Sequence, residues 1–149
     1  LKVDAQGIFL VRVVSDMMTT DHESFRPWMN HVPIAEEYKD HRVMIDAADM
    51  RGVSLLQLKA LGEFVNNVLQ SVEVIDRHGK STATWETANL YLICDEFVIP
   101  LTAKYRCSFV ELVANAEQVP RWFVSHWWGT PFWQSLQMLN FHSKMRSLT

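Results

Sequence analysis

Residues 121–132 read Arg121-Trp-Phe-Val-Ser-His-Trp-Trp-Gly-Thr-Pro-Phe132, a run in which an apolar segment turns abruptly into a marked helix start. Residues 121–126 have the apolar and aromatic character of a strand. Thr130 is a typical N-cap, and the proline after it suits the first position of a helix. The sequence therefore predicts a strand ending at His126, a sharp turn, and a last helix from Pro131 towards Lys144.

Other segments predict that strands alternate with helices. Residues 7–14 are apolar and rich in β-branched side chains, residues 42–45 form a short apolar run, and residues 72–75 alternate as a strand does. The clearest helix follows Ser54, a plausible N-cap, because leucines and valines recur there three and four residues apart. This alternation is typical of an α/β fold, so we expect a mostly parallel sheet flanked by helices.

Three other segments have weaker signals. Residues 86–99 fit either a buried strand or a helix that is apolar nearly all round, and Pro100 is expected to end either one. Ser108 and Glu111 match a capping box, which predicts a short helix to about residue 117. Residues 16–33 are polar and contain two prolines, so we expect a loop or a short helical excursion, and a brief helix over residues 33–39.

The composition describes one ordinary globular unit. The chain has 149 residues, of which 48% are hydrophobic and 21% charged, and it shows neither a repeat nor a linker, so residues 1–149 are expected to form a single α/β domain. A net charge of −3 disfavours a nucleic-acid partner, and no apolar run is long enough for a membrane span. Because the chain begins at Leu1, we expect it to be either a processed product or an incomplete portion of a larger protein.

The strand end near Ser125 is the candidate ligand site. Ligands of open α/β sheets bind beyond the carboxyl ends of strands, and a helix N-terminus with free N–H groups suits an anionic small molecule. The alternative is that the two tryptophans pack under neighbouring loops while His126 fixes the turn. His126 is the one candidate catalytic residue, since an imidazole exchanges a proton near neutral pH. The candidate ligand-binding residues are Ser125, His126, Trp127, Trp128, Gly129 and Thr130.

Metal and cofactor chemistry find no support in the sequence. The six histidines have no metal-binding spacing, and the triplet Gly79-Lys-Ser81 lacks the first glycine of a phosphate-binding loop, so neither a metal nor a cofactor is expected. Cys94 and Cys107 are expected to be buried, reduced thiols. These observations favour an intracellular protein, either cytoplasmic or organellar.

The last helix carries apolar side chains on two sides. Phe132, Trp133, Leu136 and Leu139 form one stripe, which suits packing on the rest of the domain. A second patch on the far side predicts an interface with a protein partner or with the remainder of a longer chain. Cover by the loop at residues 16–33 is the alternative. The predicted interface residues are Met138, Phe141 and Met145.

The string from Cys107-Ser-Phe-Val-Glu-Leu-Val113 to Phe123-Val-Ser-His-Trp-Trp-Gly129 resembles a group of largely uncharacterised proteins from dinoflagellates and other single-celled algae. The likeness extends over about residues 85–142. It implies, at most, a targeted subunit of an algal organelle complex.

Phe123-Val-Ser-His126 also resembles the string that ends the first strand of Toll/interleukin-receptor-type domains. In that family the strand opens the domain, and NAD-cleaving members carry a catalytic glutamate well downstream. Only 23 residues follow His126 in this 149-residue chain, so no catalytic glutamate is carried over.

These observations predict a non-catalytic α/β interaction module or a peripheral subunit of a larger assembly. One alternative is a nucleotide- or NAD-handling enzyme or sensor with its site at residues 125–129. Another is the algal organelle subunit that the first resemblance implies.

Overall fold

The computed structural model describes residues 8–10, 26–30, 42–77, 79–103 and 105–147. The brief helix expected at residues 33–39 lies outside these ranges. Most of the loop expected at residues 16–33 lies outside them as well, and so does the second half of the strand expected at residues 7–14.

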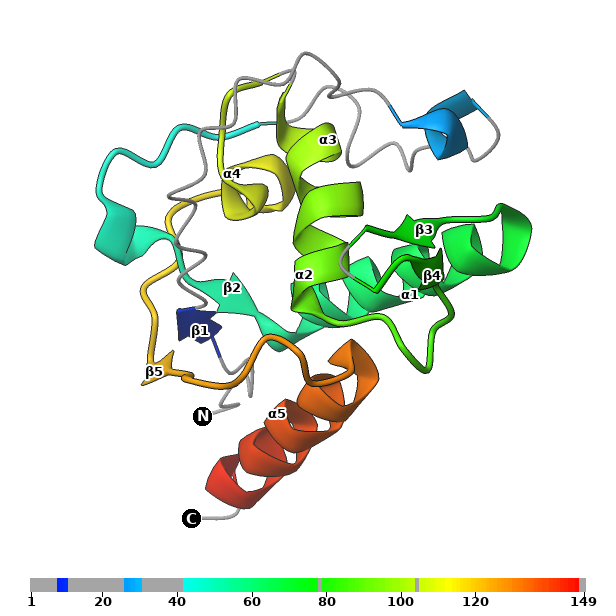
Figure 1. The fold of residues 1–149 in the computed structure, drawn as a ribbon. Coiled ribbons are helices and arrows are strands. Elements are labelled where there is room, and N and C mark those ends of the chain that lie inside the picture. The colour runs from blue at the N-terminus through cyan, green and yellow to red at the C-terminus, as the bar shows by residue number, and fades with distance from the viewer. Residues whose placement is uncertain (1–7, 11–25, 31–41, 78, 104, 148–149) are drawn as a thin grey trace.

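Helices dominate the described chain, and each strand is two or three residues long (Figure 1). The helical elements are the 3-10 turns η1 (Pro27–Asn30) and η3 (Ala48–Met50), the helices α1 (Leu55–Ser71) and α2 (Leu90–Ile93), the π turn η4 (Cys94–Val98), and the helices α3 (Ile99–Ala103), α4 (Phe109–Val113) and α5 (Phe132–Ser147). The strands are β1 (Ile8–Leu10), β2 (Val53–Ser54), β3 (Ile75–Asp76), β4 (Ser81–Thr82) and β5 (Trp122–Phe123).

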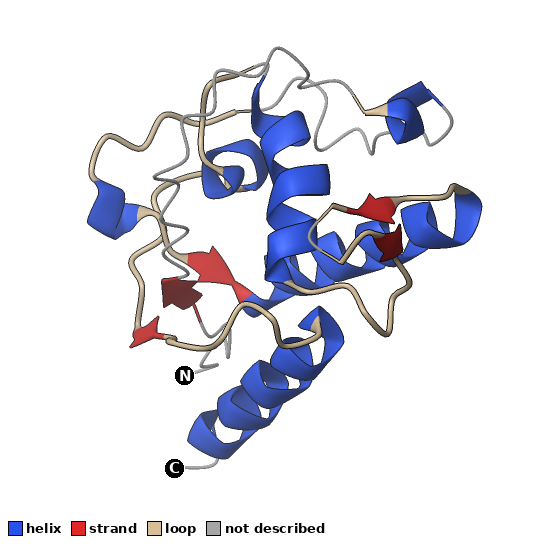
Figure 2. Cartoon of the chain, viewed as in Figure 1, coloured by secondary structure: helices blue, strands red, loops and turns tan. Residues whose placement is uncertain are grey.

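The expected mostly parallel sheet flanked by helices is wrong. Three strands form a small sheet in the order β2-β1-β5, in which β1 runs antiparallel to β2 and parallel to β5. β3 and β4 form a separate antiparallel hairpin. Figure 2 shows short strands beside a mainly helical body, so the described chain has a helical fold with a small mixed sheet.

The predicted fold class was wrong because segments with strand-like sequence patterns make few of their backbone hydrogen bonds to other strands. Residues 42–45 form no strand; there the Val43 N–H donates to the Glu111 carbonyl (2.9 Å) and the Ile45 N–H donates to the Glu111 carboxylate (3.0 Å). In residues 121–126 the exposure alternates along the chain as in a strand, yet only Trp122 and Phe123 pair with β1. Alternating burial therefore arose here without an extended sheet.

Residues 86–99, which fitted either strand or helix, are helical from Leu90 onward. Pro100 does not end the helix, because α2, η4 and α3 continue through it to Ala103. Proline has no N–H and its ring collides with the carbonyl four residues earlier, here that of Glu96. The π turn just before Pro100 relieves this conflict by widening the helix, and the Ile99 N–H bonds the Cys94 carbonyl.

The carbonyls that the π turn frees are used by the segment around η1. The Trp28 indole N–H donates to the Glu96 carbonyl, and Arg26 Nη2 donates to the Asp95 carbonyl, both at 3.0 Å. Arg26 Nε also pairs with the buried Glu96 carboxylate at 2.9 Å. The Trp28 ring stacks on Phe97 at 5.5 Å, so this segment is held by both polar and aromatic contacts.

The helix predicted after Ser54 is confirmed as α1. Ser54 Oγ accepts the Gln57 N–H, and Gln57 Oε1 accepts the Ser54 N–H, which makes a capping box. One face of α1 is buried against the helix through η4 and against α5. The buried residues of α1 are Leu55, Leu58, Leu61, Gly62, Val65 and Val68.

Helices α1 and α5 approach each other closely at Gly62. A Cβ added there would lie 2.9 Å from Leu136 Cδ1 and 3.2 Å from Trp85 Cη2. On the same pair of helices, Lys59 Nζ donates to Asn140 Oδ1 at 2.8 Å. Gly62 therefore makes room for the first half of α5, while Figure 1 shows the second half of α5 extending away from the helical body.

Within the part of the chain that the structure describes, no helix combines the length and apolarity that crossing a membrane requires.

Replacing Gly62 with leucine should separate α1 from α5. Leucine gains about 0.8 kcal/mol in helix propensity, but its side chain has no space beside Leu136 and Trp85. Overpacking of this kind costs about 1–3 kcal/mol, so we expect urea unfolding to show a net loss near 1–2 kcal/mol. Asn67→Leu, on the exposed side of α1, is the control and should leave the free energy of unfolding nearly unchanged. Wild-type stability in Gly62→Leu would contradict the close approach.

Candidate functional site

A cleft of about 410 Å³ separates the extended chain after β5 from α5. Its volume is within the range typical of small-molecule sites. Side chains from α1, the start of α2, β5 and α5 contribute to it. The lining residues are Leu58, Leu90, Trp122, Phe123, Val124, Ser125, His126, Phe132, Ser135, Met138, Leu139 and His142.

Backbone bonds hold the two helix starts beside this cleft. The Phe132 N–H donates to the Ala88 carbonyl at 2.7 Å, and the Leu90 N–H donates to the Trp128 carbonyl at 3.1 Å. The Phe132 ring is buried and meets Trp85 edge to face at 6.3 Å. The chain between β5 and α5 is therefore fixed at both ends, and it runs back along α5 (Figure 1).

Two of the predicted ligand-binding residues, Ser125 and His126, line the cleft. His126 Nδ1 lies 3.0 Å from the Trp127 carbonyl oxygen, which can only accept, so Nδ1 carries the proton and Nε2 is left for another partner. The other four predicted residues are not among those that line it. The Trp127 side chain is 73% exposed and its indole lies against Gly129, in the space that a Cβ would fill.

Trp128 and Thr130 have local roles. The Trp128 ring lies 5.5 Å from the Tyr91 ring, and the Thr130 N–H donates to the Trp127 carbonyl at 3.1 Å. At the start of α5, where the sequence predicts an anion site, three N–H groups donate to carbonyls of the chain itself. Phe132 donates to Ala88, while the Gln134 and Ser135 N–H groups both donate to the Pro131 carbonyl.

The structure adds four residues that the sequence analysis did not connect with the site. His142 meets the Trp122 ring edge to face at 5.0 Å, and the Arg146 guanidinium lies over the same ring at 4.7 Å from its centroid. Ser135 is 4% exposed and lines the cleft, and its Oγ has no hydrogen-bond partner among the described residues. Ser135, His142 and Arg146 lie in the predicted last helix, but nothing in the sequence connects them with Trp122.

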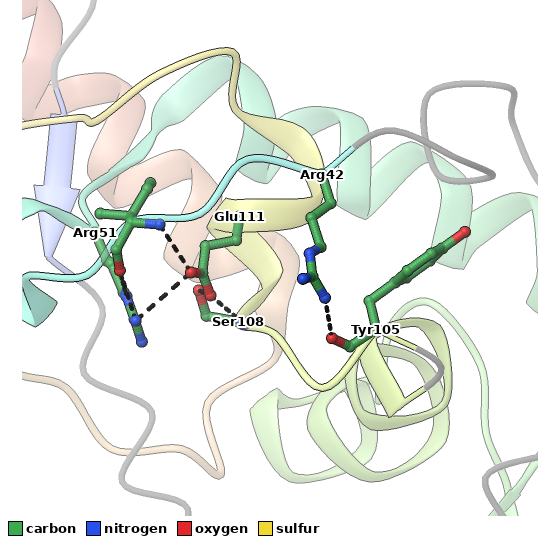
Figure 3. Close-up of polar contacts among 6 residues, drawn as sticks. Arg42, Arg51, Tyr105, Ser108 and Glu111 are labelled. Carbon is green, nitrogen blue, oxygen red and sulfur yellow. Dashed lines mark hydrogen bonds and ion pairs between the residues drawn. The ribbon is translucent and has the colours of Figure 1, made fainter.

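A second polar cluster centres on Glu111 in α4 (Figure 3). Its carboxylate accepts the Ser108 N–H and hydroxyl, both at 2.8 Å, and the Ile45 N–H at 3.0 Å. Arg51 Nη2 lies 3.5 Å from the same carboxylate and donates to the Ile45 carbonyl. The predicted capping box is thus confirmed, although α4 ends at Val113 instead of near residue 117.

Burial alone would raise the pKa of Glu111, but the hydrogen bonds from Ser108 and Ile45 and the charge of Arg51 outweigh it and lower the pKa below its ordinary value. A carboxyl group held in its ionised form by these donors serves as a structural anchor. The contacts of Glu111 with the Ile45 N–H and with Arg51 join α4 to residues 42–51, so the cluster fixes this long loop to the helical body.

The thiols are not activated. Burial, with a smaller contribution from the charge of Asp95, raises the pKa of Cys94 to about 11, and burial also raises the pKa of Cys107. Both are free cysteines, as the sequence predicts, but they are partly and not fully buried. Since a nucleophilic cysteine needs its thiolate, neither has the environment of one. Among the described residues, no group of three His, Cys, Asp or Glu is placed to hold a metal ion.

No protein-family model, curated protein or solved structure matches this chain. The resemblances to algal proteins and to Toll/interleukin-receptor-type domains therefore remain predictions from short strings.

Replacing Glu111 with glutamine should weaken the anchor of residues 42–51. The change removes the charge that the Ser108 and Ile45 donors stabilise, and we expect a loss of about 2–3 kcal/mol in free energy of unfolding at pH 7. Because the folded-state pKa of Glu111 is lowered, its contribution is present above its ordinary pKa of 4.5 and is lost as the pH falls through the lower, folded-state value.

The stability difference between wild type and Glu111→Gln, measured by urea unfolding from pH 7 to pH 3, should therefore shrink towards low pH. Glu117→Gln, at an exposed position shortly after α4, is the control and should show no such convergence. A stability gap that stays constant with pH would contradict the role given to the carboxylate.

Proposed function

We propose that this chain is a non-catalytic interaction module whose last helix docks on another protein. The docking face consists of Met138, Phe141 and Met145, which form the second apolar patch of α5. The observation that carries the proposal is the exposure of these side chains, which is 55%, 66% and 52% respectively.

The geometry of α5 supports this face as a continuous surface. The three residues stand at positions i, i+3 and i+7, so they lie along one side of the helix. The contacts of α5 with α1 use other positions, notably Leu136 and Asn140. An apolar stripe opposite a packed face is unusual in a chain that works alone, and such patches mark sites of association.

The patch extends beyond the helix. Phe123 of β5 is 68% exposed, and both Phe123 and Met138 line the cleft. Large, flexible methionines and phenylalanines are enriched at the cores of protein interfaces, where they are buried upon contact. This supports a partner that covers α5 from the side of the cleft, either a separate subunit or the remainder of a longer chain.

The two alternative functions have narrower support. A nucleotide- or NAD-handling site is favoured by Ser125 and His126 in the cleft wall. At the start of α5, however, the Phe132, Gln134 and Ser135 N–H groups already donate to carbonyls, so these three amides do not serve a phosphate. A subunit of an algal organelle complex rests on the resemblance alone.

Sedimentation velocity of the 149-residue chain tests the docking face. In the absence of its partner, we expect the uncovered face to cause concentration-dependent self-association. The triple variant Met138→Ser, Phe141→Ser, Met145→Ser should shift this equilibrium towards monomer because the apolar contact is lost. Met44→Ser removes a methionine that is also exposed, but outside α5, and is the matched control.

Peroxide oxidation of methionines in the same samples gives a second measurement. In the monomer, Met138 and Met145 should oxidise at rates close to that of the exposed Met44. A monomer at all concentrations in which Met138 and Met145 resist oxidation would contradict the proposal, because the face would then be covered from within.

A further inference from the structure

The wall of the cleft between β5 and α5 contains no acidic side chain and no lysine or arginine among the described residues. Its polar side chains are two serines and two histidines, and the rest of the lining is apolar. An ionised ligand would lose its hydration on entering this cleft and would find no carboxylate, ammonium or guanidinium in the wall to pair with, which is costly. A neutral molecule with an apolar body is therefore favoured over an ion.

Ser135 is the buried polar residue of this wall. It is 4% exposed, and its Oγ makes no hydrogen bond with any described residue. A buried hydroxyl without a partner is unfavourable, because it has left water and gained no bond in return. Phe132, Ser135 and Leu139 stand at positions i, i+3 and i+7 of α5 and all line the cleft, so this hydroxyl lies between apolar neighbours on one side of the helix.

Other helical hydroxyls of this chain have a local partner that Ser135 lacks. A serine or threonine inside a helix commonly donates its hydroxyl to the carbonyl four residues earlier. Ser71 and Thr102 do so, at 2.7 and 2.8 Å. For Ser135 that carbonyl belongs to Pro131, and it already accepts the N–H groups of Gln134 and Ser135 at 3.0 and 3.3 Å. The local acceptor is in use, so the Ser135 hydroxyl is left for a group from outside the helix.

We propose that the cleft binds a small neutral molecule with an apolar body and one hydroxyl or carbonyl group, which forms a hydrogen bond with Ser135 Oγ. A serine hydroxyl both donates and accepts, so it serves either group. The apolar body lies against Leu58, Phe132 and Leu139, of which the first two are buried. The proposal goes beyond the docking face, since it depends on Ser135 and predicts binding by the chain without a protein partner.

Titration of the full chain with 1-octanol and with octanoate, at neutral pH and at a protein concentration where the chain is monomeric, tests the class of ligand. The two probes have similar apolar bodies, but only octanoate is charged. We expect 1-octanol to bind saturably and octanoate to bind at least about tenfold more weakly, because its charge is desolvated without compensation. Octanoate binding as tightly as 1-octanol would overturn the neutral class, and absence of saturable 1-octanol binding up to its solubility limit would overturn the site.

Methionine methyl NMR locates the bound 1-octanol. Met138 lines the cleft, whereas Met145 and Met44 are similarly exposed but do not line it. We expect 1-octanol to shift the ε-methyl signal of Met138 and to leave those of Met145 and Met44 unchanged. Equal shifts of all three signals would show unspecific binding to exposed methionines and would overturn the site.

Ser135→Ala tests the hydrogen bond to the ligand. It should weaken 1-octanol binding about fivefold, because one neutral hydrogen bond is lost. It should not lower the free energy of unfolding of the ligand-free chain, because it removes a hydroxyl without a partner and alanine has the higher helix propensity.

Thr102→Val is the matched control, because it removes a buried helical hydroxyl that does have a partner, the Val98 carbonyl. It should lower the free energy of unfolding and leave the affinity for 1-octanol unchanged. Wild-type affinity for 1-octanol in Ser135→Ala, or a ligand-free chain that this change destabilises, would overturn the role of Ser135.

Discussion

The architecture depends on the contact of α5 with α1 at Gly62. Glycine at this position lets Leu136 and the Trp85 ring come within about 3 Å of where a Cβ would stand. The contact uses one side of the first half of α5. It therefore determines which side of the helix faces the cleft and which side chains remain exposed. One edge of α5 becomes a wall of the cleft, to which Met138 contributes, and Met138, Phe141 and Met145 all remain exposed.

A second constraint arises from Pro100 in the middle of a helix. The π turn before it frees the carbonyls of Asp95 and Glu96, and these bind Arg26 and Trp28, which come from a distant part of the chain. Glu96 is buried with two arginine partners, because Arg77 Nε also lies 3.0 Å from its carboxylate. An irregular helix thus organises long-range contacts that a regular one would not offer.

Local signals in the sequence predicted the parts of the fold that depend on neighbouring residues. Ser54 and the leucine spacing after it located α1, and Ser108 with Glu111 located the start of α4. Thr130-Pro131 located the start of α5 within one residue. Wrong predictions came from patterns whose meaning depends on distant partners. Residues 121–126 have the apolar and aromatic character of a strand, but the length of a strand is set by what pairs with it.

The residues of the candidate site likewise fall into those that the sequence predicted and those that it could not predict. Ser125 and His126 were found because they end an extended segment, and both line the cleft. Trp122 with His142 and Arg146 could not be found from the sequence, because their contact forms only when β5 and α5 lie side by side. The Phe132 N–H at the start of α5 donates to the Ala88 carbonyl, and this pairing of distant residues could not be predicted from the sequence either.

The packing of α5 on α1 is tested most directly by a ¹³C-edited NOE experiment. It measures the proximity of the Gly62 α-protons to the δ-methyl groups of Leu136. The packing described here predicts a strong cross-peak, with a further one from Gly62 to the ring of Trp85. If both cross-peaks are missing in the folded protein, α5 does not lie across α1, and neither the cleft nor the exposed side of the last helix exists in the form described.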